Sequence, residues 1–432
     1  MRSDNLFAFA IFAITAFGFF VWGYQYIPTH HFLLFSIASI FGIFMAFNIG
    51  GNDVANSFGT SVGAKTVTIK QALIIAAIFE LSGAIFAGGE VTKTIREGIV
   101  SFPQEGTEPM LFVLIMMSAL LSSGIWLFIA SKKGLPISTT HSIVGGIVGA
   151  GLTMGFTTMS GDKALAMVSW GEIGRIAVSW VISPLLGGIL SYFIYGYIKS
   201  RILIPTRKFT LELKVLKRER KAYKERYLQE LKTKPESEQI RILSKIAVLD
   251  EDDVESGERS EYKLAIKAMK EREKELDTSK AMRKHIPMVA GIGAIIISSM
   301  MLFKGLAHLN LDIGFIGTIW IICVIGIVTY LATLAMINVM KKDNAEKSTN
   351  RIFSWFQIFT ASSFAFSHGA NDIANAVGPF AAILDVLKTG SINATAPVPG
   401  IAMVTFGISL VVGLWFLGKE VITTIGSKLA EI

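Results

Sequence analysis

The amino-acid sequence predicts an all-α polytopic membrane protein built from two homologous repeats. We expect about ten to twelve transmembrane helices, some of them discontinuous or re-entrant. Of the 432 residues, 52% are hydrophobic and only 17% are charged, with a mean hydropathy of +0.54, which is typical of a chain that lies in a bilayer. Charge-free apolar runs recur at close to the ~20 residues that a spanning helix needs. In addition, one polar motif occurs twice.

Six charge-free runs reach or approach the length of a spanning helix. They are Leu6–Tyr24, Phe32–Asn52, Pro109–Ser131, Ile176–Ile198, Ile313–Met340 and Thr389–Gly418. Further spans are predicted at Gln71–Gly89, Leu135–Met159, His285–Phe303 and Ile352–Phe366. The first run has no clear small-residue cleavage site, so we interpret it as a retained helix. The single cysteine, Cys323, excludes an intramolecular disulfide and is interpreted as a packing residue.

A charged segment, residues 199–285, separates a first membrane repeat, residues 1–198, from a second, residues 286–432. From Lys199 to Lys284 it carries 24 of the 41 basic and 17 of the 33 acidic residues, so its net charge of 24 − 17 = +7 supplies most of the chain's +8. The mixed-sign pattern is typical of solvated helices with charge pairs three and four residues apart. Basic residues at both membrane ends predict a cytoplasmic loop. Acidic residues interrupt the basic runs and no known binding motif is present, so we do not expect nucleic acid as a partner.

The duplicated motif reads FNIGGNDVANSFGT at Phe47–Thr60 and FSHGANDIANAVGP at Phe366–Pro379. Seven of fourteen positions are identical at an offset of 366 − 47 = 319, and a second match relates Gly88–Ile95 to Gly418–Ile425. Each copy places a carboxylate and two carboxamides within five positions, which are Asn52, Asp53 and Asn56, and Asn371, Asp372 and Asn375. Because such groups are costly in lipid, carboxylates in both copies predict a site and not helix caps. We expect helix breaks at Gly50, Gly59, Gly369 and Gly378, where freed carbonyls and side-chain oxygens would form a hard-cation site.

A second polar constellation, LPISTTHS at Leu135–Ser142, occurs once. Pro136 followed by a hydroxyl cluster predicts a helix start at membrane depth. Unpaired N–H groups, the positive end of the helix dipole and the hydroxyls of Ser138, Thr139 and Thr140 together favour a tetrahedral oxyanion.

Two titratable residues have roles that the sequence leaves open. His141 is compatible with a structural hydrogen bond and with a ligand role. Glu80, alone in an apolar span, is compatible with coupling or gating and with a structural hydrogen bond.

The motifs GGNDVANS, GANDIANA, LPISTTH and FSHGAND, with the charged central segment, resemble the inorganic phosphate transporter (Pit) family of sodium- or proton-coupled phosphate symporters. The resemblance covers both membrane repeats. It implies an inverted-repeat carrier that moves phosphate by alternating access, driven by a cation gradient. Family members usually carry a second STTH-like segment after the GKEV-like stretch. Here only 432 − 420 = 12 residues follow Glu420, so the resemblance implies the first anion site and leaves a second one open.

The resemblance also implies roles for individual residues, carried over by position. The phosphate-binding residues are Ser138, Thr139, Thr140, His141, Asn52 and Asn371. The sodium ligands are Asp53, Asn56, Asp372, Asn375 and Gln357. His368 matches a polar position that leads into the second motif, and it is taken as a candidate for coupling or gating together with Glu80, whose candidacy rests on its place in an apolar span. No cofactor is implied; the expected partners are inorganic phosphate, sodium and the lipid bilayer of the cell membrane, and a homodimer is left open.

Charge alone favours cation coupling, because a phosphate anion cannot lie near Asp53 and Asp372 in a low dielectric without compensating cations. Sodium suits asparagine, aspartate and backbone oxygens, and protonation of the aspartates is the alternative. Sulfate or another oxyanion is the alternative substrate, since hydroxyl and N–H donors do not distinguish it from phosphate.

Two other classes of protein are less consistent with the sequence. An intramembrane hydrolase would use Ser138 or Ser142 with His141, but catalysis gives no reason to duplicate the aspartate motif, so we do not expect an enzyme. A passive channel is the second rival, and accumulation of substrate against its gradient would exclude it.

Overall fold

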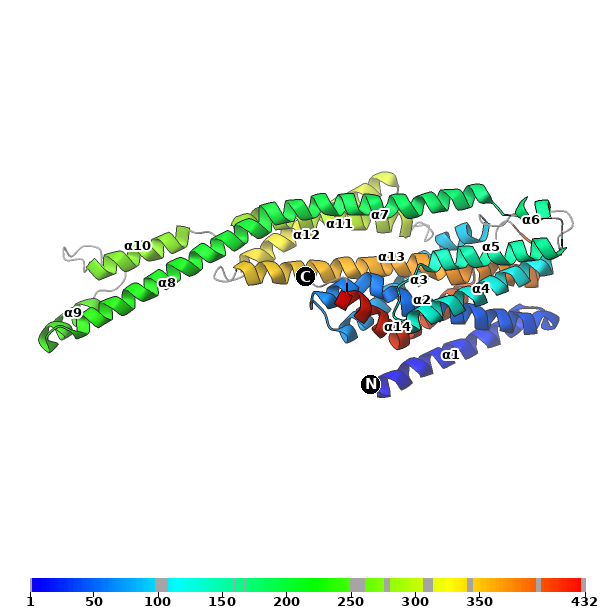
Figure 1. Ribbon diagram of the computed structural model, residues 1–432, viewed down its shortest axis with the longest axis horizontal. Coiled ribbons are helices and arrows are strands. Elements are labelled where there is room, and N and C mark those ends of the chain that lie inside the picture. The colour runs from blue at the N-terminus through cyan, green and yellow to red at the C-terminus, as the bar shows by residue number, and fades with distance from the viewer. Residues whose placement is uncertain are drawn as a thin grey trace. The chain divides into compact units, whose positions relative to one another are not determined.

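The computed structural model describes residues 2–97, 108–158, 161–166, 168–248, 261–275, 280–305, 314–339, 345–393 and 398–428. All regular elements within these ranges are helices (Figure 1). Eight of the described helical stretches are long and apolar enough to cross a membrane. The predicted all-α polytopic membrane fold is therefore confirmed.

The helices follow one another along the chain with few long connections. The first part contains α1 (Arg2–Tyr26), η1 (Thr29–His31), α2 (Phe32–Gly63), α3 (Ile69–Glu97), α4 (Pro109–Lys132), α5 (Thr139–Thr158), α6 (Gly161–Ala166) and α7 (Trp170–Ile198). The charged segment contains η2 (Lys199–Leu203), α8 (Ile204–Lys232), α9 (Glu236–Val248) and α10 (Glu261–Glu275). The last part contains α11 (Lys280–Met300), η3 (Met301–Gly305), α12 (Phe315–Val339), α13 (Ala345–Thr389) and α14 (Gly400–Lys428).

One predicted span has the wrong starting point. The sequence places its start at Thr389, whereas in the structure α13 ends at this residue. Gly390 adopts a φ of 71°, a left-handed conformation that commonly terminates helices. The next helix, α14, begins only at Gly400, directly after Pro399.

The described residues form two compact units. The first unit comprises Met1–Leu185, Ile295–Ile322 and Ser354–Ile432, and the second comprises Leu186–Ala294 and Cys323–Phe353. Within the second unit, α8 and α10 lie side by side, and Arg220 of α8 pairs with Glu273 of α10 at 3.0 Å (Figure 1).

The core of the first unit joins segments from both ends of the chain. Four buried phenylalanines, Phe19, Phe35, Phe380 and Phe406, come from α1, α2, α13 and α14 respectively. Their rings pack closely, with 5.0 Å between the centroids of Phe380 and Phe406. Each such ring removes roughly 150–250 Å² from solvent, so this cluster makes a large contribution to holding α2 against the last two helices.

The helix breaks that the sequence predicts at Gly50, Gly59, Gly369 and Gly378 do not occur. Helix α2 continues from Phe32 to Gly63 and α13 continues from Ala345 to Thr389. A continuous helix satisfies its own backbone groups, which is the less costly arrangement where lipid offers no partners. Gly50 and Gly369 instead allow helices to approach closely: a Cβ at Gly50 would collide with the carbonyl of Leu410, and one at Gly369 would collide with the backbone of Glu80.

Two further glycines complete these close contacts from the opposite helices. A Cβ at Gly413 of α14 would meet the carbonyl of Phe47 on α2, and one at Gly83 of α3 would meet the carbonyl of Phe366 on α13. The two helix pairs, α2 with α14 and α3 with α13, therefore pack by the same glycine-to-backbone contact. This packing fixes the site because α2, α3 and α13 supply its acidic side chains.

Candidate functional site

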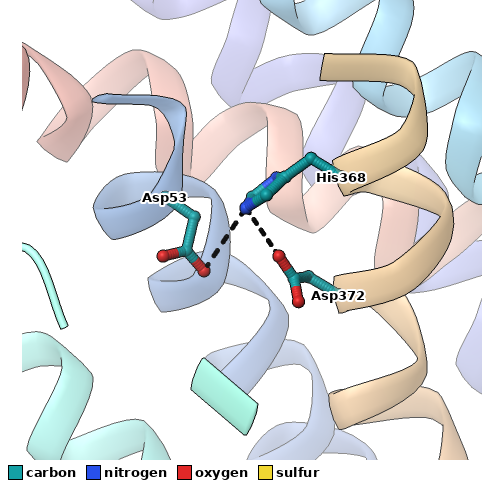
Figure 2. A group of neighbouring side chains, drawn as sticks. All are labelled: Asp53, His368 and Asp372. Carbon is teal, nitrogen blue, oxygen red and sulfur yellow. Dashed lines mark ion pairs between the residues drawn. The ribbon is translucent and has the colours of Figure 1, made fainter. Parts of the chain in front are cut away.

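The centre of the site is a group of three side chains from helices far apart in sequence. Figure 2 shows Asp53 of α2 and His368 and Asp372 of α13 pointing toward one another. His368 Nε2 lies 2.5 Å from Asp372 Oδ2 and 3.8 Å from Asp53 Oδ2. One ligand atom from each residue lies within 4.8 Å of the others, so the group could hold a metal ion. The two copies of the repeated motif thus place their aspartates around one imidazole.

A third carboxylate, Glu80 of α3, lies on the other side of the imidazole. Its Oε1 is 3.5 Å from His368 Nδ1, and its side chain is 0% exposed. Neither Glu80 oxygen has a hydrogen-bond partner among the described residues. The same is true of His368 Nδ1. Even with a protonated imidazole, three ionised carboxylates leave a net charge of −3 + 1 = −2 in a buried space. Charge of this kind is costly to bury, and intramembrane carboxylates are typical of functional sites.

The start of α5 brings hydroxyl groups to the same cluster. Thr139 Oγ1 donates to Asp53 Oδ2 at 2.9 Å, and Asn375 Nδ2 donates to Thr140 Oγ1 at 3.3 Å. Ser138 caps the helix, because its Oγ accepts the His141 N–H at 3.2 Å. The predicted helix start in this segment is therefore present, and it lies against the carboxylates.

The two motif copies make equivalent contacts within the cluster. In the first copy, Asn56 Nδ2 donates to Asp53 Oδ1 at 3.4 Å, and in the second, Asn375 Nδ2 donates to Asp372 Oδ1 at 3.1 Å. Each copy also contacts one of the two consecutive threonines, Thr139 or Thr140. The copies differ in exposure: Asn56 is exposed, whereas Asn375 is buried and its Oδ1 has no hydrogen-bond partner among the described residues.

Four residues predicted for the site lie outside this cluster. Gln357 precedes His368 by 11 residues on α13, about 16 Å along a helix, and its Oε1 accepts from Thr66 Oγ1 at 2.6 Å. His141 is exposed and its ring contacts that of Trp180 in a tilted arrangement, with centroids 3.6 Å apart. The other two are Asn52, which bonds to the segment before α5, and Asn371, which is exposed.

Contacts between helices are the part that sequence reasoning missed. The Glu80–His368 and Thr139–Asp53 pairs join residues that are 288 and 86 positions apart, and helical periodicity carries no information about such partners. A usable signal exists in the repeat: Glu80 and His368 correspond to Leu410 and Ile49 in the other copy, at offsets of 410 − 80 = 330 and 368 − 49 = 319. A polar residue that replaces an apolar one in only one copy, beside a repeated aspartate, is a candidate for the same site.

Membrane-spanning helices around a buried acidic cluster define an integral membrane transport protein as the class. A model of the Phosphate transporter family matches residues 49–432, so the chain belongs to this family. The resemblance that the motifs suggest is confirmed, and the chain is a membrane protein of phosphate transport.

Relatives of known name and structure agree with this assignment. "Putative phosphate permease Mb2302" of Mycobacterium bovis is 47% identical over 401 residues, which are 92% of this chain and 73% of that protein. "Putative phosphate permease PYRAB14010" of Pyrococcus abyssi is 31% identical over 394 residues, which are 91% of this chain and 77% of that protein. A solved structure named "The sodium-dependent phosphate transporter" is similar with a TM-score of 0.64 and 29% identity, over 93% of this chain and 79% of that chain.

Proposed function

We propose that this protein imports inorganic phosphate by coupling it to sodium, and that Asp53 and Asp372 are the residues at which coupling occurs. One observation carries the proposal: Asp53, one of three buried carboxylates grouped around His368, accepts from the Thr139 hydroxyl at the start of α5, and the neighbouring Thr140 contacts Asn375 of the second motif copy. A cation site and an oxyanion site in direct contact are what coupled transport requires.

The order of binding follows from charge. The acidic cluster would repel a phosphate anion while its carboxylates are ionised and unneutralised. A cation bound between Asp53 and Asp372 lowers this repulsion, so phosphate affinity increases when the cation is present. The hydroxyls of Ser138, Thr139 and Thr140 and the N–H groups at the start of α5 then supply donors to the phosphate oxygens.

The donor set fits sodium. Asp53, Asp372 and Asn375 offer oxygen atoms, which are the ligands that hard cations prefer. Asn375 Oδ1 is buried without a hydrogen-bond partner among the described residues, so it is a free acceptor beside the aspartates. The solved relative whose name includes "sodium-dependent" supports the same ion. Asn56 is proposed as a further ligand, and Glu80 and His368 as coupling residues that set the charge of the cluster.

Alternating access is proposed on the basis of the reciprocal packing. Gly50 packs against Leu410, and Gly369 packs against Glu80. Gly369 is the counterpart of Gly50 at the offset of 319, and Leu410 is the counterpart of Glu80 at the offset of 330, so the two contacts are equivalent in the repeat. Two inverted halves, residues 1–198 and 286–432, would move against each other around the acidic cluster. The charged segment, residues 199–285, would face the cytoplasm, as its flanking basic residues predict.

Uptake into liposomes tests the proposal. Purified protein in vesicles should accumulate labelled phosphate when an inward sodium gradient is imposed at equal pH on both sides. A choline gradient of the same ionic strength is the matched control, and labelled sulfate is the substrate control. Uptake that requires only a pH gradient would replace sodium by protons, and equal uptake of sulfate would remove phosphate specificity.

A further inference from the structure

Asn52 directly precedes Asp53 on α2, but its hydrogen bonds go to the end of α4 and to the segment that joins α4 to α5. Its Nδ2 donates to the carbonyl of Leu135 at 2.9 Å and to Ser131 Oγ at 3.1 Å. Its Oδ1 accepts from the backbone N–H of Ile137 at 2.9 Å. Both amide protons and the carbonyl oxygen of this fully buried side chain are thus engaged with the end of α4 and the segment that follows it.

The segment needs such a partner. Residues 133–138 lie between α4 and α5, Gly134 adopts a φ of 66°, and Pro136 has no N–H to donate. Asn52 bonds both the carbonyl of Leu135 and the N–H of Ile137, as a neighbouring strand would in a sheet. Loss of this side chain would leave two part-buried backbone groups without this partner, and the segment would have to shift to recover one.

The same segment leads directly into the hydroxyls that we propose bind phosphate. Ser138 caps α5, Thr139 bonds Asp53, and Thr140 accepts from Asn375. The geometry points to Asn52 as a positioning residue: it fixes residues 133–138 so that these hydroxyls face the cation site, and it does not itself bind phosphate. This inference rests on the proposed function and replaces the ligand role that the sequence suggests for Asn52.

A double-mutant cycle in the vesicle assay tests the positioning role of Asn52. Its readouts are the Michaelis constant for phosphate and the half-saturating sodium concentration. Asn52→Ala removes all three bonds and should raise the Michaelis constant for phosphate about tenfold, with half-saturating sodium within about twofold of wild type. Ser131→Ala removes one bond and should raise it about two- to fivefold, although Ser131 is a buried residue of α4 and is not among the hydroxyls proposed to bind phosphate. The double variant should equal Asn52→Ala alone, because the bond between the two residues is already lost.

Asn48→Ala is the matched control, since Asn48 is an asparagine one turn earlier on α2 whose Nδ2 donates, among the described residues, to the carbonyl of Phe44 of its own helix. It should leave the Michaelis constant for phosphate unchanged. A wild-type constant in Ser131→Ala, additive effects in the double variant, or an equal rise in half-saturating sodium would each overturn the inference. If Asn52→Ala does not fold, Ser131→Ala decides alone. A wild-type protein that takes up no phosphate would instead refute the proposed function, and the positioning role with it.

Discussion

Removal of the His368 side chain should destabilise the first unit more than any other single change at the site. The imidazole contacts Asp372 at 2.5 Å, Glu80 at 3.5 Å and Asp53 at 3.8 Å, and its side chain is only 9% exposed. His368→Ala therefore leaves three buried carboxylates facing one another. Removal of one partner from a buried ion pair typically costs about 3–5 kcal/mol, so we expect the unfolding midpoint to fall by roughly 10 °C.

Sodium should compensate for part of this loss. A ligand that binds only the folded state stabilises it by about 2.7 kcal/mol at one hundred times its dissociation constant. Because His368→Ala has a larger uncompensated negative charge, its midpoint should rise more with sodium than that of the wild-type protein. The measurement is intrinsic-fluorescence melting of the detergent-purified protein in sodium chloride and in choline chloride at equal ionic strength.

Two further variants make the interpretation specific. His30→Ala removes an exposed histidine and should melt as wild type does. Adding Glu80→Gln to His368→Ala removes one of the three facing carboxylates and should restore part of the lost stability. A His368→Ala protein that melts within about two degrees of wild type, with no sodium dependence, would refute the reasoning that the imidazole balances this charge.

Three other outcomes are expected. Asp53→Asn and Asp372→Asn should each reduce sodium-driven phosphate uptake by a similar factor, because the two aspartates occupy equivalent places in the repeat; a large difference between them in the vesicle assay would contradict this. Gly369→Ala should destabilise the protein by about 1–3 kcal/mol, since its Cβ would overlap the backbone of α3, whereas Gly145→Ala, which meets nothing within 4 Å, should be neutral in the same melting experiment. Burial, and after it two neighbouring tyrosines, raise the pKa of the Tyr262 phenol. The protonated phenol therefore contributes to the free energy of unfolding below the ordinary tyrosine pKa of about 10, and this contribution is lost as the pH rises through the higher pKa of the folded state. Tyr262→Phe should remove that alkaline loss in a pH series of melting curves.

Much of the fold could be predicted because apolar runs and helical length are local properties. Most of the predicted spans correspond to described helices, and the family assignment follows from motifs that can be read directly, such as GGNDVANS. The expected breaks at Gly50 and Gly369 were wrong for a physical reason. A glycine in an apolar helix permits either a break or a close approach by another helix, and only the neighbouring helix decides between them.

The site residues show the same limit. The sequence indicates that Asp53 and Asp372 share a role, and the structure brings both to His368. The sequence gives no means of separating Asn52 from Asn56, because both are carboxamides close to the same carboxylate. In the structure Asn52 bonds the segment before α5, whereas Asn56 bonds the aspartate. That distinction depends on which helix face meets the segment before α5, a property of tertiary packing.

The least predictable part of the cluster is the part that the two copies do not share. Reasoning from a repeat gives weight to positions that are the same in both copies, which here are the aspartates and their asparagines. Glu80 and His368 have Leu410 and Ile49 as their counterparts, so weighting of shared positions passes over them, and only a search for polar residues that replace apolar ones would single them out. Yet these two residues supply the third carboxylate and the imidazole that bridges all three acids. Because the repeat provides two equivalent acids and the asymmetric pair adds one further acid and one base, the charge of the cluster is controlled by residues that occur only once in the chain.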